Sequence, residues 1–187
     1  MATLSFYYGC MNSSKSLNAL AIYNSYIENH KKIALLKPKI ENRDGANVIR
    51  SRVGMEAQCE FVEDFLKRTL SDREYDLIIV DESQFLTTEQ VNDLAKIVDS
   101  LNIPVKCYGL RTDFQGKLFE GAAALFALAN EIKEINTICW CGKQAIFNAR
   151  VSSGHIVHKG DLIQMGGNDT YHPLCRLHYN QDKPSPV

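Results

Sequence analysis

The segment that follows the first apolar run of the chain has the residue types of a phosphate-binding loop. It fits the pattern G-x-x-x-x-G-K-[ST] at all but one position and consists of Gly9, Cys10, Met11, Asn12, Ser13, Ser14, Lys15 and Ser16. Backbone N–H groups of such a loop hold phosphate oxygens, the lysine neutralises their charge, and the final hydroxyl reaches Mg²⁺. The alternative is a polar turn with a solvated lysine. Ser14 replaces the second glycine of the pattern, so it must take the loop's backbone angles without glycine's freedom.

A second group of candidate residues follows the apolar segment 77–80. This segment is typical of a strand covered on both faces in a parallel sheet, and Asp81 and Glu82 come directly after it. An aspartate at this place holds Mg²⁺ in nucleotide-binding proteins, and ligands bind at the carboxyl ends of strands in open α/β sheets. Alternatively, both carboxylates end the strand and face solvent. Combined with the phosphate loop, the pair favours a nucleotide site.

The last third of the chain holds a candidate zinc site. Its ligands are a C-x-C pair and a C-x-x-H pair, formed by Cys139, Cys141, Cys175 and His178. Zinc takes four such ligands tetrahedrally in structural sites. Two thiols in a C-x-C reach one ion only if the chain turns between them, and Gly142 favours such a turn. His172 is the rival fourth ligand, and unpaired surface thiols are the alternative to a metal site.

These residues need an alternation of strands and helices to position them. Apolar patterning predicts strands at 3–8, 32–36, 77–80, 104–108 and 132–138, and helices at 17–28, 55–70 and 120–130. A further helix begins after a cap at Thr87 or Thr88, and the polar segment 37–54 is expected to be a loop. The alternation predicts an α/β fold with a P-loop NTPase-like parallel sheet flanked by helices.

After Cys139 the pattern changes to short strand-like pieces broken by glycines. We therefore expect three parts: a nucleotide-binding domain at 1–138, a small zinc-binding domain at 139–180, and a flexible tail at 181–187.

Composition narrows the class of protein. The chain has 187 residues, a formal net charge of −1 and 45% hydrophobic residues, as in ordinary globular proteins. The neutral balance argues against a nucleic-acid partner, and no apolar run approaches the roughly 20 residues of a membrane span. The N-terminus lacks the pattern of a secretory signal, so we expect a cytoplasmic location. In that compartment Cys10, Cys59 and Cys107 are expected to be reduced and buried.

Four motifs in order resemble the type II family of thymidine kinases. They are FYYGCMNSSKS at 6–16, VDESQFL at 80–86, CYGLRTDF at 107–114 and GGNDTY at 166–171. The C-x-C and C-x-x-H pairs are similar to those of the bacterial branch. The resemblance extends from about residue 4 to 179, and Ser14 departs from it, because the family ordinarily has glycine there.

This resemblance implies transfer of the γ-phosphate of ATP to the 5′-hydroxyl of thymidine. Because a pocket discriminates one methyl group by only about 1–3 kcal/mol, we expect deoxyuridine to be a substrate as well. Glu82 matches the family's general base. Lys15 and Arg43 would balance phosphate charge, Ser16 and Asp81 would hold Mg²⁺, and Gln84 lies in the matching nucleotide segment.

The resemblance also implies a nucleoside site. A loop called the lasso, which fits residues 163–171, grips the base through its backbone. Its implied contact residues are Ile163, Gly166, Gly167 and Tyr171, with Met11, Leu110 and Phe114 packed on the ring. Simple core packing is the alternative for Phe114 and Tyr171. Zinc would be structural, and the family implies a homotetramer inhibited by thymidine triphosphate.

Two other functions remain open from the sequence. One is a zinc-ribbon protein that binds nucleotides or nucleosides with an impaired phosphate loop and little turnover, which Ser14 motivates. The other is an ATPase that uses water as acceptor, which leaves the lasso-like segment unexplained.

Overall fold

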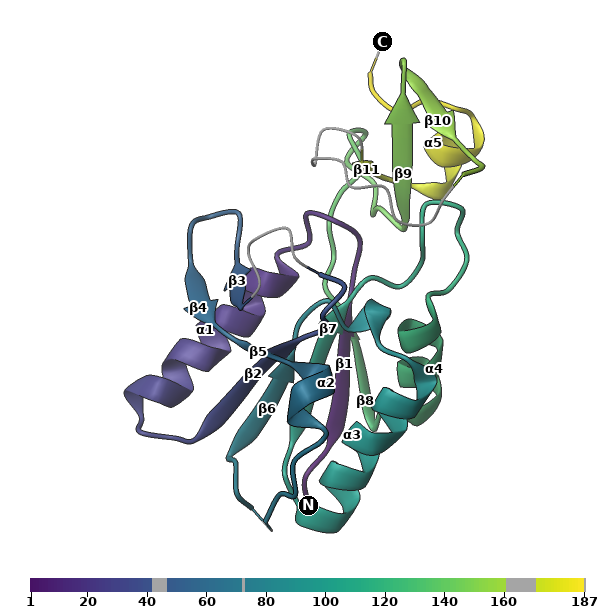
Figure 1. Ribbon diagram of the computed structural model, residues 1–187. Helices are drawn as coiled ribbons and strands as arrows, with labels where there is room; N and C mark the ends of the chain where they lie inside the picture. Colours follow the sequence, from purple (N-terminus) through teal and green to yellow (C-terminus); the bar gives the residue numbers. More distant parts are fainter. Residues whose placement is uncertain (42–46, 72, 161–170, 187) are drawn as a thin grey trace.

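The computed structural model describes residues 1–41, 47–71, 73–160 and 171–186, and its largest element is a six-stranded parallel sheet (Figure 1). The strand order is β5 (Glu60–Phe61), β2 (Ile33–Lys37), β6 (Leu77–Val80), β7 (Val105–Gly109), β1 (Leu4–Tyr8) and β8 (Glu131–Glu134). Three longer helices flank it: α1 (Lys15–Glu28), α3 (Thr88–Leu101) and α4 (Glu120–Leu128). The predicted α/β fold with a parallel sheet flanked by helices is confirmed.

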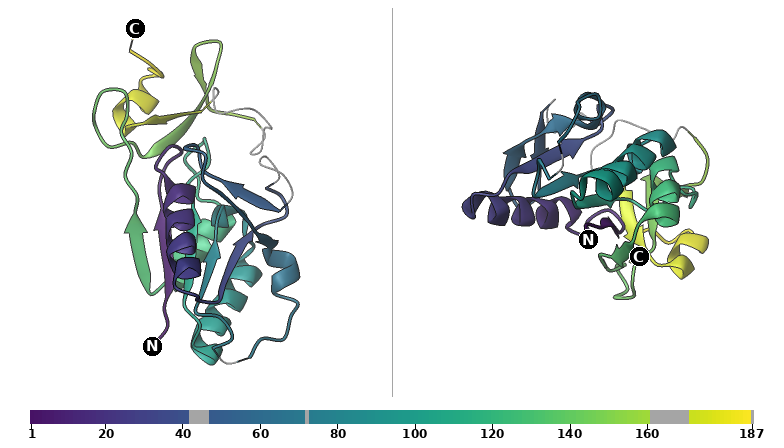
Figure 2. Two further views of the ribbon diagram at one scale, coloured as in Figure 1. Left: turned by 90° about the vertical axis from the view of Figure 1, so that its left-hand side faces the viewer. Right: turned by 90° about the horizontal axis from the view of Figure 1, so that it is seen from below.

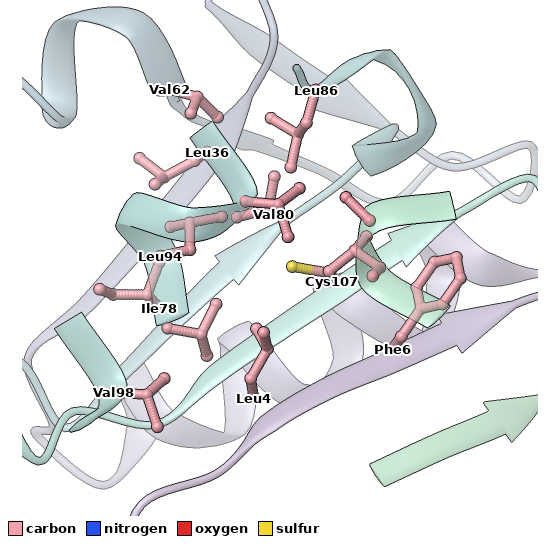
Figure 3. Packing of buried hydrophobic residues seen from close by; sticks show 14 of the residues in the cluster. Leu4, Phe6, Leu36, Val62, Ile78, Val80, Leu86, Leu94, Val98 and Cys107 are labelled. Atoms are coloured by element: carbon pink, nitrogen blue, oxygen red, sulfur yellow. The ribbon is translucent and has the colours of Figure 1, made fainter. Parts of the chain in front are cut away.

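Each face of the sheet is covered by an apolar layer. Successive residues of a strand point to opposite faces of the sheet, so β6 contributes side chains to both apolar layers. Ile78 and Val80 belong to the cluster under α3 and α4 (Figure 3), whereas Leu77 and Ile79 belong to the cluster under α1. Views from two further directions show α1 on the face opposite to α3 and α4 (Figure 2). This double covering explains the unbroken apolar run that the sequence shows at 77–80.

A smaller antiparallel sheet lies beyond the carboxyl ends of the large sheet's strands (Figure 1). Its strand order is β10 (His155–Val157), β9 (Phe147–Ser152) and β11 (Tyr171–Leu174), and helix α5 (Arg176–Asn180) follows. The boundaries of the small domain at 139 and 180 stay a prediction. Asp182, in the predicted tail, accepts a hydrogen bond from the Ile156 N–H at 2.5 Å, which ties the start of the tail to this sheet.

The helix predicted over 55–70 is wrong. The segment instead forms β4 (Glu56–Gln58), β5 and the single turn α2 (Val62–Phe65), and β4 pairs with β3 (Val48–Arg50) inside the predicted loop. Met55, Ala57 and Cys59 are alternate residues and pack together on the cluster under α1. The alternation of packed side chains at every second residue therefore makes 55–59 a strand region. The helical spacing of apolar residues at 61–66 supports only one helical turn.

Other boundaries differ by smaller amounts. Helix α1 begins at Lys15, two residues earlier than predicted, and α3 is capped by Thr87, whose hydroxyl accepts from the Gln90 N–H at 3.2 Å. The last strand, predicted at 132–138, is the shorter β8, an edge strand whose residues are all exposed. Among the described residues, we find no helix long and apolar enough to cross a membrane.

Helix α4 packs unusually closely on the short 3₁₀ turn η1 (Ser83–Phe85) that follows β6. A Cβ atom at Gly121 would lie 2.5 Å from the Ser83 carbonyl oxygen and 2.8 Å from that of Leu86. Both neighbours are backbone atoms, so no side-chain rotation relieves the overlap. Turn η1 can therefore lie this close to α4 only because residue 121 is a glycine and has no side chain.

We expect Gly121→Ala to lower the free energy of unfolding by at least about 1 kcal/mol, although alanine is the better helix former. Urea denaturation measures the change. Ala123→Ser, at an exposed position of the same helix, is the control and costs about 0.5 kcal/mol or less. A Gly121→Ala protein as stable as the control would contradict the close packing.

Candidate active site

The phosphate loop connects β1, an inner strand of the large sheet, to α1. The Gly9 N–H donates to the Gly109 carbonyl at 3.2 Å, which fixes the start of the loop against the end of β7. Its other residues differ in exposure: Cys10 and Ser13 are buried, Met11 and Ser16 half-buried, and Asn12 and Ser14 exposed. The loop thus lies at the carboxyl edge of the sheet, as the sequence predicts.

The side chain of Lys15 is buried inside this loop. Its Nζ donates to the Cys10 carbonyl at 2.6 Å and to the Ser13 hydroxyl at 3.2 Å. Burial lowers the pKa of Lys15, and the nearby carboxylates of Glu82 and Asp81 oppose that shift. The loop therefore wraps a cation, as a phosphate site requires, and the two carboxylates that follow β6 partly balance its charge.

Ser14 occupies a left-handed backbone conformation, with φ 60° and ψ 29°. Its side chain is exposed and makes no capping hydrogen bond to α1. Glycine adopts this region without strain, whereas an L-residue there costs about 1–2 kcal/mol. The loop therefore keeps the conformation that favours glycine, and serine bears the strain.

Asp81 is buried, and Ser16 is one of the neighbours that act on its carboxylate. Burial and the neighbouring Glu82 raise the pKa of Asp81, while Ser16 and Lys15 lower it. A carboxylate and a hydroxyl are the hard oxygen ligands that Mg²⁺ takes, together with water and phosphate oxygens. The donor set fits the predicted Mg²⁺ site.

Glu82 is half-buried at the end of β6 and is anchored through Gln84. The Gln84 amide donates to the Glu82 carboxylate at 2.5 Å, and its oxygen accepts from the Leu110 N–H at 2.9 Å. Gln84 is itself 2% exposed. The glutamine thus links the candidate base to the segment after β7, whereas the sequence assigned it only to the nucleotide.

Sequence reasoning missed Asn148, which joins the small sheet to the phosphate loop. Its Oδ1 accepts from the Met11 N–H at 2.7 Å, and its Nδ2 donates to the Thr112 carbonyl at 3.1 Å. The signal was present in the strand itself, because Asn148 and Arg150 are alternate polar residues within β9. Both are buried, so that face of β9 is directed into the protein.

Phe114 and Tyr171, predicted to line the base pocket, both contact Arg150. Phe114 is 2% exposed, and Tyr171 is half-buried. The remaining predicted residues Arg43, Ile163, Gly166 and Gly167 lie outside the described residues.

The four predicted zinc ligands come together around one point. Their ligand atoms lie within 4.8 Å of one another, with Cys139 Sγ 3.4 Å from His178 Nδ1 and Cys141 Sγ 3.9 Å from Cys175 Sγ. Tetrahedral zinc with Zn–S of about 2.3 Å and Zn–N of about 2.1 Å requires edges of about 3.6–3.8 Å. The donor set fits zinc, and the described part of the chain places His178 in the group instead of His172.

Local structure accounts for this convergence. Gly142, with φ +83°, turns the chain after the first pair, and its N–H donates to the Cys139 carbonyl at 2.8 Å. Cys175 directly precedes α5, so His178 follows within the first turn of that helix. The thiols elsewhere are buried as predicted, and burial raises the pKa of Cys10 and of Cys59 to about 11.

Comparison with known proteins gives the family. Residues 2–179 match the family model described as thymidine kinase. The chain belongs to the thymidine kinase family. Thymidine kinases of Streptococcus pyogenes serotype M1 and Lactococcus lactis subsp. lactis are 41% and 40% identical over 185 residues, spanning 96% of this chain and 97% of each relative. That of Lactiplantibacillus plantarum is 41% identical over 186 residues, or 96% of both chains. The resemblance drawn from the sequence motifs is confirmed.

Similarity to solved structures is weaker. A DNA replication initiation factor has a TM-score of 0.42 and 13% identity, covering 72% of this chain and 40% of its own. The Pif1 helicase from Candida albicans has a TM-score of 0.44 and 17% identity, covering 73% and 36%. At these scores neither similarity carries a functional conclusion.

We expect Ser14→Gly to raise the free energy of unfolding by about 0.5–1 kcal/mol. The substitution removes left-handed strain, and the greater freedom of glycine in the unfolded chain offsets part of that gain. Urea denaturation measures it, with Ser152→Gly at an exposed end of β9 as the control. A loss of stability in Ser14→Gly would mean that the serine side chain contributes more than its strain costs.

We expect Cys175→Ser to lose zinc and to change the fluorescence of Trp140, the chain's one tryptophan. The Trp140 ring stacks on His178 with centroids 4.1 Å apart, so it reports on the ligand's position. Metal analysis and emission spectra measure both effects, and Cys59→Ala, a thiol outside the cluster, should retain the metal. Stoichiometric zinc in Cys175→Ser would refute the ligand assignment.

Proposed function

We propose that the protein is an ATP-dependent thymidine kinase that transfers the γ-phosphate of ATP to the 5′-hydroxyl of thymidine. The observation that carries this proposal is the meeting of Lys15, Asp81 and Glu82 at one edge of the sheet. Family membership supplies the substrates. The site supplies a cation for phosphate, oxygen ligands for Mg²⁺ and a separate carboxylate for a proton.

In the proposed reaction the 5′-oxygen forms a bond to the γ-phosphorus as the bond between that phosphorus and the β–γ bridging oxygen breaks. ADP leaves, and the proton of the 5′-hydroxyl passes to a carboxylate oxygen of Glu82. Gln84 holds that carboxylate, since it is anchored on the Leu110 N–H. Little more than a positioned carboxylate is needed, because the transition state is loose.

The negative charge of the ATP phosphates would be balanced by groups of the phosphate loop and by Mg²⁺ held at the end of β6. Lys15 would turn from the Cys10 carbonyl and Ser13 hydroxyl toward the phosphates, with Arg43 as a second proposed cation. Ser16 and Asp81 would hold Mg²⁺, which neutralises charge on the β- and γ-phosphates when bound. The backbone of residues 9–14 would contact the phosphate oxygens.

The nucleoside would bind between the carboxyl edge of the large sheet and the small sheet. Met11, Leu110, Phe114 and Tyr171 would surround the base, and Ile163, Gly166 and Gly167 would grip it from the lasso. A pocket discriminates one methyl group by only about 1–3 kcal/mol, so deoxyuridine is proposed as a second substrate. Zinc would fix the small domain and take no part in the transfer.

The remaining proposals follow the family. They are a homotetramer, inhibition by thymidine triphosphate and a cytoplasmic location, which the free cysteines fit. The alternative of a binding protein with an impaired loop rests on Ser14. It is not favoured, because Ser14 adopts the left-handed conformation that glycine would take and Lys15 remains inside the loop.

We expect Glu82→Gln to lower kcat for thymidine by about 10²–10⁴-fold, because glutamine cannot accept the proton. ATP binding should be retained, since Lys15 and Asp81 are unchanged. Coupled ADP release measures turnover, and calorimetry measures ATP affinity. Glu89→Gln, at an exposed position of α3, is the control. Full turnover in Glu82→Gln would remove Glu82 as the base, and no turnover in the unsubstituted protein would favour the binding-protein alternative.

A further inference from the structure

Arg150 is a buried arginine at the centre of the small sheet. It is 5% exposed and lies on the middle strand, directly opposite Tyr171 of β11 and Val157 of β10. A guanidinium has five N–H donors in a fixed plane and is costly to bury unless each face and edge is engaged. Its neighbours therefore show what the strand uses it for.

The guanidinium lies over an aromatic ring from another part of the fold. Its central carbon lies 3.8 Å from the centroid of Phe114, which belongs to the connection between β7 and α4. A cation at this distance from a buried ring is attracted by the ring's negative face and packs on it. Arg150 thereby links the small sheet to the connection that follows β7 of the large sheet.

The edge of the same group is directed at the opposite strand. The Nε–H donates to the Tyr171 hydroxyl at 2.9 Å. Because register places Tyr171 beside Arg150, this bond fixes the direction of the tyrosine ring. A terminal nitrogen of Arg150 also lies beside Gly160, 3.5 Å from the position that a Cβ atom of residue 160 would occupy. The Gly160 carbonyl in turn accepts a hydrogen bond from the Gln115 side-chain amide at 3.3 Å.

We propose that Arg150 is a positioning residue for nucleoside binding, whose guanidinium fixes the Phe114 ring and the Tyr171 phenol relative to each other across the junction of the two sheets. The inference rests on the proposed function, because that function makes these two rings the walls of the base pocket. Arg150 acts through the two rings and takes no part in phosphoryl transfer.

A lysine at this position would not do the same. Its ammonium is a point charge on a flexible stem, so it cannot stack a plane on Phe114 while a separate N–H holds Tyr171. We therefore expect the planar shape of the guanidinium to matter, and not only its positive charge. Both Arg150→Lys and Arg150→Met should loosen the pocket.

Steady-state kinetics on zinc-loaded protein provide the test. We expect Arg150→Lys and Arg150→Met to raise the KM for thymidine by about tenfold or more, with kcat and the KM for ATP within about twofold of the unsubstituted protein. Arg176→Lys, at an exposed position of α5, is the matched control and should leave all three constants unchanged. Zinc content and the thermal midpoint are measured for every variant.

Tyr171→Phe tests the link from its other side, because it removes the acceptor of the Arg150 Nε–H and leaves the arginine itself unsubstituted. It should raise the KM for thymidine, and adding it to Arg150→Met should raise the KM by less than the product of the two single effects, because both remove one hydrogen bond. Multiplicative effects would show that the two residues act independently, and would overturn the inference.

The two levels of proposal fail differently. If the unsubstituted protein does not phosphorylate thymidine, the proposed function fails and this inference falls with it. If that protein is active but Arg150→Met and Arg150→Lys keep its KM for thymidine, only the inference fails. Equal changes in the KM for ATP and for thymidine, with a lowered thermal midpoint, would show a general structural effect and would also overturn it.

Discussion

The burial of Lys15 beside Asp81 is the interaction on which the rest of the site depends. Each charge loses solvation at the carboxyl edge of the sheet, so burial shifts both pKa values toward the neutral forms, and each group opposes the other's shift. The loop must close around the ammonium, as its bonds to Cys10 and Ser13 show. A triphosphate bound as proposed would give the ammonium stronger partners than these, because a phosphate carries more charge than a carbonyl or hydroxyl.

Closing the loop so tightly imposes backbone strain around the buried pair. Asn12, Ser14 and Glu82 all have φ between 51° and 66°, in the left-handed region, and all three lie in the phosphate loop or at the end of β6. Such strain persists only where the surroundings determine the conformation. Here β1 and β6 are fixed within a sheet covered on both faces, and η1 is held against α4 at Gly121. The rigid scaffold lets the candidate base stay in a sparsely populated conformation.

The small sheet is attached to this scaffold through β9 and α5. Asn148 holds the Met11 N–H of the phosphate loop, Arg150 covers Phe114, and the Tyr179 hydroxyl donates to the Phe114 carbonyl at 2.7 Å. The group of Cys139, Cys141, Cys175 and His178 joins α5 to the turn at Cys139. A zinc ion there would stabilise the strand and helix that touch both proposed substrate sites, although it lies in the small domain. Through this connection a structural zinc ion would influence the proposed substrate binding without taking part in the proposed transfer.

The sequence by itself determined the alternation of strands and helices around the loop, the acidic end of β6 and the cysteines and histidine of the candidate zinc site. Those features follow from local patterns: a four-residue apolar run, a fixed loop spacing and two short cysteine motifs. Residues 55–70 were mispredicted, because pairing with β3 and β2 outweighed a helical spacing too short to sustain more than one turn. Only the tertiary structure brought Gln84 to Leu110, Asn148 to Met11 and Arg150 to Phe114. These partners are separated by 26 or more residues. The pairing of β6 with β7 brings Gln84 to Leu110, and the docking of the two sheets brings the other two pairs together, so no local pattern encodes these contacts.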